Sequence, residues 1–153
     1  MLIIGIDPGV SGGIAYHHGS GVTLVNIPET EADIIRELYA MTEGEEWFAF
    51  IEWIHPAIQG ISKSAMSKLY GSYMALRMAL TANKIPFEVV KPEVWQKAIG
   101  MPRRNGMESN KWKNCLKAKA QQLFPKETIT KDTADALLIA EYGRRLRAGE
   151  FSK

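Results

Sequence analysis

Residues 2–7 read LIIGID and residues 8–13 read PGVSGG, so an apolar run ends on Asp7 and passes into a glycine-rich turn. An apolar run bounded by turn residues predicts a strand buried on both faces of a sheet. Asp7 would then end a buried strand, where a carboxylate is costly unless a partner compensates its charge. We expect a metal ion as that partner, with turn initiation by Asp7 as the alternative. The small residues of the turn would let a bulky sugar-phosphate chain approach Asp7.

The segments that follow predict an α/β fold. We expect strands over residues 2–7, 13–17, 22–27, 47–52 and 87–90, and helices over residues 31–41, 65–83, 92–97, 110–124 and 130–147, with Ser109 capping the fourth helix. Short turns make the first three strands an antiparallel meander, and the strand at 47–52, reached through a helix, should run parallel to an earlier one. The sequence therefore predicts one domain over residues 1–153, with a mixed five-stranded sheet and helices on its faces.

Three further carboxylates can be placed beside Asp7. Glu52 ends the strand at 47–52, and Asp132 and Asp135 are spaced i, i+3 on the first turn of the last helix. Several carboxylates are needed to hold the two ions of a two-metal phosphodiester hydrolase, and oxygen ligands favour Mg²⁺ or Mn²⁺. Two simpler interpretations stay open: Asp132 and Asp135 could serve only the helix dipole, and Glu52 could pair with a lysine.

Charge is unevenly distributed along the chain. The net charge is +2, yet residues 91–119 carry +6 and the remainder carries −4. An acidic site beside a basic surface suits a polyanionic substrate that needs cations at its scissile bond, although a lysine-rich helix face can also be only solvated. The candidate phosphate contacts are Lys97, Arg103, Arg104, Lys111, Lys113 and Lys117. Trp53 and His55 could contact unpaired bases, whereas we expect Ile58 and Ile61 to be buried.

Several classes of protein fit the sequence poorly. The single Cys115 cannot form an internal disulfide, no apolar stretch reaches about 18 residues, and no leader features are visible, so we expect a cytoplasmic protein of a reducing compartment without a membrane partner. The three histidines are too scattered for a zinc site, and turn 8–13 lacks the spacing of nucleotide-binding loops. The helix at 65–83 is apolar around much of its circumference, which favours deep burial or a homodimer.

The ordered set of strand-end Asp7 in Gly5-Ile6-Asp7-Pro8-Gly9, strand-end Glu52 and Asp132-Thr133-Ala134-Asp135 resembles the RuvC family of Holliday junction resolvases. The resemblance implies an RNase H-like fold, a homodimer, and magnesium-dependent nicking of two opposed strands of a four-way DNA junction. It assigns catalytic and metal-binding roles to Asp7, Glu52, Asp132 and Asp135. Two positions depart from the family: His55 stands where an aromatic wedge is common, and Trp95 stands where a lysine implicated in catalysis lies, with Lys97 two positions on. The short chain and divergent loops look like phage or mobile-element members.

The leading hypothesis is therefore a crossover junction endodeoxyribonuclease. A nuclease for flaps, forks or RNA/DNA hybrids would share the same acidic site, and a noncatalytic junction-binding module would share the basic surface. Actin-like ATPases and sugar kinases have a similar strand turn but need two such domains. Each nuclease hypothesis requires that Asp7, Glu52 and Asp135 converge in space.

Overall fold

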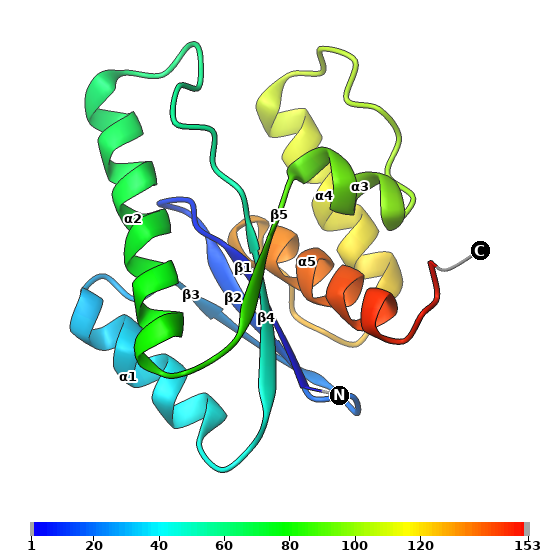
Figure 1. Ribbon diagram of the computed structural model, residues 1–153. Helices are drawn as coiled ribbons and strands as arrows, with labels where there is room; N and C mark the ends of the chain where they lie inside the picture. The colour runs from blue at the N-terminus through cyan, green and yellow to red at the C-terminus, as the bar shows by residue number, and fades with distance from the viewer. Residues whose placement is uncertain (1, 152–153) are drawn as a thin grey trace.

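The computed structural model describes residues 2–151, so both ends of the predicted domain 1–153 lie outside the described residues. The described part forms a five-stranded sheet with helices on both faces (Figure 1). Its elements are β1 (Leu2–Asp7), β2 (Gly13–His17), β3 (Val22–Asn26), α1 (Glu31–Thr42), β4 (Trp47–Glu52), α2 (Lys63–Ala82), β5 (Phe87–Val90), α3 (Pro92–Ala98), α4 (Ser109–Leu123) and α5 (Lys131–Arg147). No helix within residues 2–151 is long and apolar enough to cross a membrane.

The sheet has the order β3-β2-β1-β4-β5 and confirms the predicted mixed topology. β1 pairs antiparallel with β2 and parallel with β4, and β5 also runs parallel to β4. Ile6 of β1 lies opposite Ile51 of β4, so the next residues, Asp7 and Glu52, end neighbouring strands at the same edge of the sheet. The predicted convergence of these two carboxylates follows from this parallel pairing.

Two apolar layers cover the sheet. In Figure 1, α1 and α2 lie on one face, and α3, α4 and α5 lie on the other. Side chains of β1 alternate between the two layers: Ile4 and Ile6 pack toward α1 and α2, and Ile3 packs toward α5. Every residue of α5 from Thr133 to Gly143 is buried. Because it is buried all round, α5 is the central helix of the second layer.

Two glycines allow α5 to approach the sheet closely. A Cβ atom on Gly5 would lie 2.1 Å from the carbonyl oxygen of Ala136, and one on Gly13 would lie 2.7 Å from that of Asp132. Both distances are shorter than a van der Waals contact, so any larger residue would push the helix away. The missing side chains thus let α5, which carries Asp135, pack directly on the middle of β1 and on the start of β2.

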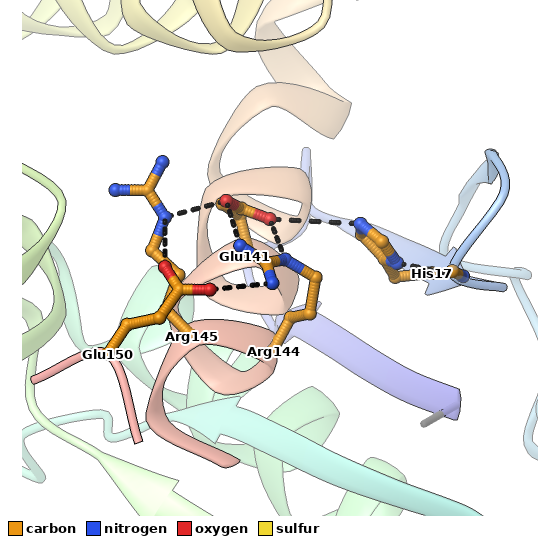
Figure 2. A network of polar contacts seen from close by, with 6 residues as sticks. His17, Glu141, Arg144, Arg145 and Glu150 are labelled. Carbon is orange, nitrogen blue, oxygen red and sulfur yellow. Dashed lines mark hydrogen bonds and ion pairs between the residues drawn. The ribbon is translucent and has the colours of Figure 1, made fainter. Parts of the chain in front are cut away.

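The other end of α5 is anchored by a polar network around Glu141 (Figure 2). Arg144 and Arg145 donate hydrogen bonds from Nε at 2.8 and 2.6 Å, and His17 Nε2 of β2 lies 3.7 Å from the same carboxylate. Burial alone would raise the pKa of Glu141, but the hydrogen bonds from both arginines outweigh it and lower the pKa. Glu141 is therefore ionised, and its contacts with the two arginines and His17 hold this end of α5 in place.

The boundaries of the elements differ little from the prediction. Ser109 was expected to cap α4, but this is wrong: Ser109 is the first helical residue and Glu108 is the cap. The Glu108 carboxylate accepts hydrogen bonds from the backbone amides of Asn110 and Lys111, at 2.8 and 3.1 Å, which one serine hydroxyl could not do equally well. α2 begins at Lys63, two residues before the predicted start, because Ser62 caps it through the amide of Ala65.

Candidate metal and nucleic-acid site

Carboxylates from two distant segments contact one lysine at the edge where β1 and β4 end. Lys113 Nζ of α4 lies 2.5 Å from Asp135 Oδ2 and 3.6 Å from Asp7 Oδ2. Asp7 and Asp135 are buried, with 6% and 5% of their surfaces exposed. A single ammonium group therefore contacts both buried acids, one from the sheet and one from α5.

Burial and mutual repulsion disfavour ionisation of these acids. Burial first, and then the Asp135 carboxylate, raise the pKa of Asp7 to about 6. Burial followed by the charges of Asp7 and Asp135 raises the pKa of Glu52 well above its ordinary value. Burial also raises the pKa of Asp135, although Lys113 opposes it. Since the charges of both aspartates raise the pKa of Glu52, the three acids belong to one electrostatic cluster.

Lys113 compensates this cluster only in part. Burial alone would lower the pKa of Lys113, but the carboxylates of Asp135 and Asp7 outweigh it and raise the pKa. The lysine is therefore an ammonium ion at neutral pH. If all three carboxylates are ionised, one ammonium group leaves an excess of negative charge, which a divalent cation would neutralise.

Glu52 is oriented by a partner on the neighbouring helix. The indole Nε1 of Trp95, a fully buried residue of α3, donates a hydrogen bond of 2.7 Å to Glu52 Oε2. This bond ties one carboxylate oxygen in place and links α3 to the end of β4. It also lowers the pKa of Glu52, although burial outweighs it.

Asp132 lies at the margin of the acidic cluster. It is half-buried and lines a depression of about 330 Å³ together with Asp7, Lys113 and the glycine-rich turn. Asp7 also accepts a hydrogen bond of 3.3 Å from the amide of Gly9, as a turn-initiating aspartate would. All four predicted acidic residues thus lie at one end of the molecule, and Asp132 lines the depression there.

The donor set fits a magnesium or manganese ion. Asp135 Oδ1 is buried and has no hydrogen-bond partner among residues 2–151, which is costly unless a cation or water uses it. The donors are carboxylate oxygens, the ligands that these hard cations prefer. Across residues 2–151, however, no three carboxylate, imidazole or thiol groups already form a closed set of ligands, and Lys113 lies between Asp7 and Asp135.

The predicted basic residues fall into two groups. Lys97, Arg103 and Arg104 line a depression of about 520 Å³ between α3 and the segment that precedes α4. Arg104 is held by donating to Met107 O at 3.0 Å and Ser109 Oγ at 2.8 Å. Lys111, Lys113 and Lys117 are on α4, where Lys113 contacts the acids and Lys111 is exposed. One helix links the basic depression to the acids, because α3 carries Lys97 of the depression and also Trp95, which contacts Glu52.

The loop after β4 exposes more apolar surface than expected. Trp53 is half-buried against the layer formed with α2, its ring meets His55 edge to face at 5.3 Å, and Lys91 Nζ lies 5.4 Å from its centre. The expected burial of Ile58 and Ile61 is wrong: they are 38% and 41% exposed. Every residue from 55 to 65 is exposed, because the loop extends away from both apolar layers.

Sequence reasoning missed two contacts in this site. The bond from Trp95 to Glu52 has no local signal, because 43 residues separate its partners. The position of Lys113 does have a local signal in the sequence. Lys113, Leu116 and Ala120 follow the i, i+3, i+7 spacing of a buried helix face, and the latter two are buried. A lysine on such a face needs a buried anionic partner.

Comparisons with known proteins support the fold. The structure of Thermus thermophilus RuvC in complex with a Holliday junction substrate is similar with a TM-score of 0.66, 17% identity, and coverage of 97% of this chain and 96% of that chain. A second Thermus thermophilus RuvC structure is similar with a TM-score of 0.61 and 18% identity, and the match covers 97% of each chain. The structure of a Fowlpox virus resolvase with Holliday junction DNA has a TM-score of 0.44 and 11% identity, and the match covers 91% of this chain and 95% of that chain. No protein-family model and no curated protein sequence matches this chain. The similarity to RuvC establishes an RNase H-like fold.

Proposed function

We propose that this protein is a magnesium-dependent endodeoxyribonuclease that resolves four-way DNA junctions. One observation carries the proposal: Asp7, Glu52 and Asp135 form one electrostatic cluster on a RuvC-like fold, at the edge where β1 and β4 end. The RuvC and poxvirus proteins to which the chain is similar were solved with Holliday junction DNA. A noncatalytic binding module would gain nothing from three acids that repel one another, two of them buried.

Asp7, Glu52 and Asp135 would hold two Mg²⁺ ions, with Asp132 beside them, and Mn²⁺ could substitute. The bound ions would supply positive charge that activates a water molecule and stabilises the leaving oxygen. The chain's own contribution is to position the ligands. Close packing of α5 on Gly5 and Gly13 presents Asp135 to Asp7, and the Trp95 indole orients Glu52.

DNA would be bound through its phosphates beside these acids. The cations are Lys97, Arg103 and Arg104 along the α3–α4 depression, and Lys111, Lys113 and Lys117 on α4. Trp53 and His55 are the candidate base contacts. Such phosphate contacts carry no sequence information, so we expect recognition of the branched shape and an affinity that falls steeply with salt.

Cutting two opposed strands requires two active sites, and we propose a homodimer. The surface shared by α1 and α2 supports it, because four large apolar side chains are exposed there: Ile35 by 40%, Tyr39 by 56%, Met74 by 45% and Met78 by 66%. Light scattering coupled to size-exclusion chromatography tests this assembly. A monomer at tens of micromolar, with or without junction DNA, would contradict it.

A cleavage assay tests the activity. Labelled four-way junction, flap, RNA/DNA hybrid and linear duplex are incubated with the protein, in magnesium or in EDTA, and we expect magnesium-dependent nicking of the junction in preference to the others. Asp7→Asn should abolish cleavage and retain junction binding. Asp33→Asn, the same change at a partly exposed residue of α1, should cleave normally. Preferential cutting of flaps or hybrids would favour the alternative nuclease functions. Full cleavage by Asp7→Asn would refute the assignment of the site.

A further inference from the structure

Lys113 occupies the place where the acidic cluster needs positive charge. Its ammonium group lies 2.5 Å from Asp135 Oδ2 and 3.6 Å from Asp7 Oδ2, so it contacts acids from two different segments. Lys113 belongs to α4, which contributes no acid to the cluster, and its half-buried side chain retains 39% exposure. The lysine thus reaches into the cluster from outside and keeps a route back to solvent.

We infer that the Lys113 ammonium group substitutes for a divalent cation in the metal-free protein and leaves the carboxylates when the metal binds. The inference rests on the proposed function, because it assumes that Asp7 and Asp135 are metal ligands. It explains why the acids fail to form a closed set of ligands among the described residues although they share one edge: an ammonium ion already lies between two of them.

Electrostatics and geometry both require the exchange. A metal ion bound to Asp7 and Asp135 would lie within a few ångströms of Lys113 Nζ, where repulsion between two cations in a partly buried site is severe. Within the described part of the chain, Asp135 Oδ1 has no hydrogen-bond partner, so an incoming ion could use this oxygen before the lysine departs. The flexible four-carbon stem of lysine allows the ammonium group to swing outward without a change in the helix.

Departure would also change what Lys113 can bind. Lys117 lies one turn further along α4. A released Lys113 could contact a phosphate next to one held by Lys117, as the sequence predicts for this pair. In the metal-free protein the same lysine is paired with acids and is not available to DNA.

Calorimetric titration with Mg²⁺, without DNA, tests the inference. Lys113→Gln should bind Mg²⁺ at least about tenfold more tightly than the unmodified protein, because a competing cation has been removed. Lys113→Arg keeps the charge and should bind no more tightly than the unmodified protein. Lys119→Gln makes the same change in net charge on α4, at a lysine without an ion pair to any residue in 2–151, and should change the affinity less than threefold.

A second measurement needs no variant and therefore no assumption about folding. Lysines of the unmodified protein are labelled with an amine-reactive reagent in EDTA or in saturating Mg²⁺, and the labelled positions are quantified by mass spectrometry. We expect labelling of Lys113 to increase severalfold with Mg²⁺ and labelling of Lys119 to stay constant.

The outcomes separate this inference from the proposed function. If the unmodified protein binds no Mg²⁺, or binds it as well after Asp7→Asn, the proposed metal site fails. If it binds Mg²⁺ at Asp7, but Lys113→Gln binds no more tightly and Lys113 stays protected from labelling, the exchange is refuted and the metal site stands. Tighter binding by Lys113→Gln together with metal-dependent labelling supports both.

Discussion

Asp7→Asn should make the metal-free protein more stable. The Asp7 carboxyl is 6% exposed, and burial, followed by repulsion from Asp135, raises its pKa from 3.8 to about 6. A carboxyl with a raised pKa binds its proton more tightly in the folded chain than in the unfolded chain. Ionisation therefore costs folding free energy: the cost is absent below pH 4, grows as the pH rises toward 6, and is complete above 6.

The size of the effect follows from the pKa. One pKa unit corresponds to about 1.4 kcal/mol, so ionised Asp7 lowers the stability by about 3 kcal/mol. That cost is already net of the attraction to Lys113, which lowers the pKa of Asp7. Asparagine removes the cost but places an amide where a carboxylate met the ammonium group, and a net gain of about 1–3 kcal/mol is expected. In a chain of this length, each kcal/mol moves the melting temperature by about 2–4 °C.

Differential scanning calorimetry in EDTA measures this gain. At pH 8 the melting temperature of Asp7→Asn should exceed that of the unmodified protein by several degrees, and at pH 4 the two should nearly coincide. Glu45→Gln, which neutralises an exposed carboxylate, should leave both temperatures within about one degree. The reasoning is refuted if Asp7→Asn is less stable at pH 8, or if its gain is as large at pH 4.

Three further substitutions, one of them with a matched control, test other features of the structure. Gly5→Ala places a methyl group against the backbone of α5 and should cost at least about 3 kcal/mol in urea unfolding, whereas Gly71→Ala in α2, where nothing lies within 4 Å, should stabilise the fold by about 0.5–1 kcal/mol. Glu141→Gln leaves two arginines with a neutral partner and should cost about 1–3 kcal/mol at pH 7, less below pH 4; an unchanged midpoint would refute the anchor. Trp95→Phe removes the hydrogen bond to Glu52 and leaves a cavity in place of part of the buried indole, so the melting temperature should fall by a few degrees. Assayed well below that temperature, kcat should be lower by about tenfold or more, and normal turnover would count against this role of the indole.

Most of the fold could be predicted because its signals are local. Strand LIIGID is an apolar run that ends at a turn, and Thr130 with Thr133 forms the cap that begins α5 where the sequence places it. The gathering of Asp7 and Glu52 at one edge followed from the parallel pairing expected of strands linked through a helix.

The remaining features depend on contacts between distant residues. Lys113 and Trp95 contact acids 22 and 43 positions away, and pairings over such distances leave little trace in a single sequence. The exposure of Ile58 and Ile61 could not be predicted from composition either, because the direction in which a loop leaves the sheet depends on the packing around it.

The burial of α5 has a consequence for how DNA would meet the acids. Eleven consecutive residues, from Thr133 to Gly143, are buried, so Asp135 belongs to a segment whose amides should exchange with deuterium as slowly as any in the molecule. Such a rigid helix cannot adjust to an imperfectly placed strand. If the protein binds DNA as proposed, the DNA backbone would have to come to Asp135, and the bending needed for alignment would fall on the nucleic acid and on the exposed segments around the helix.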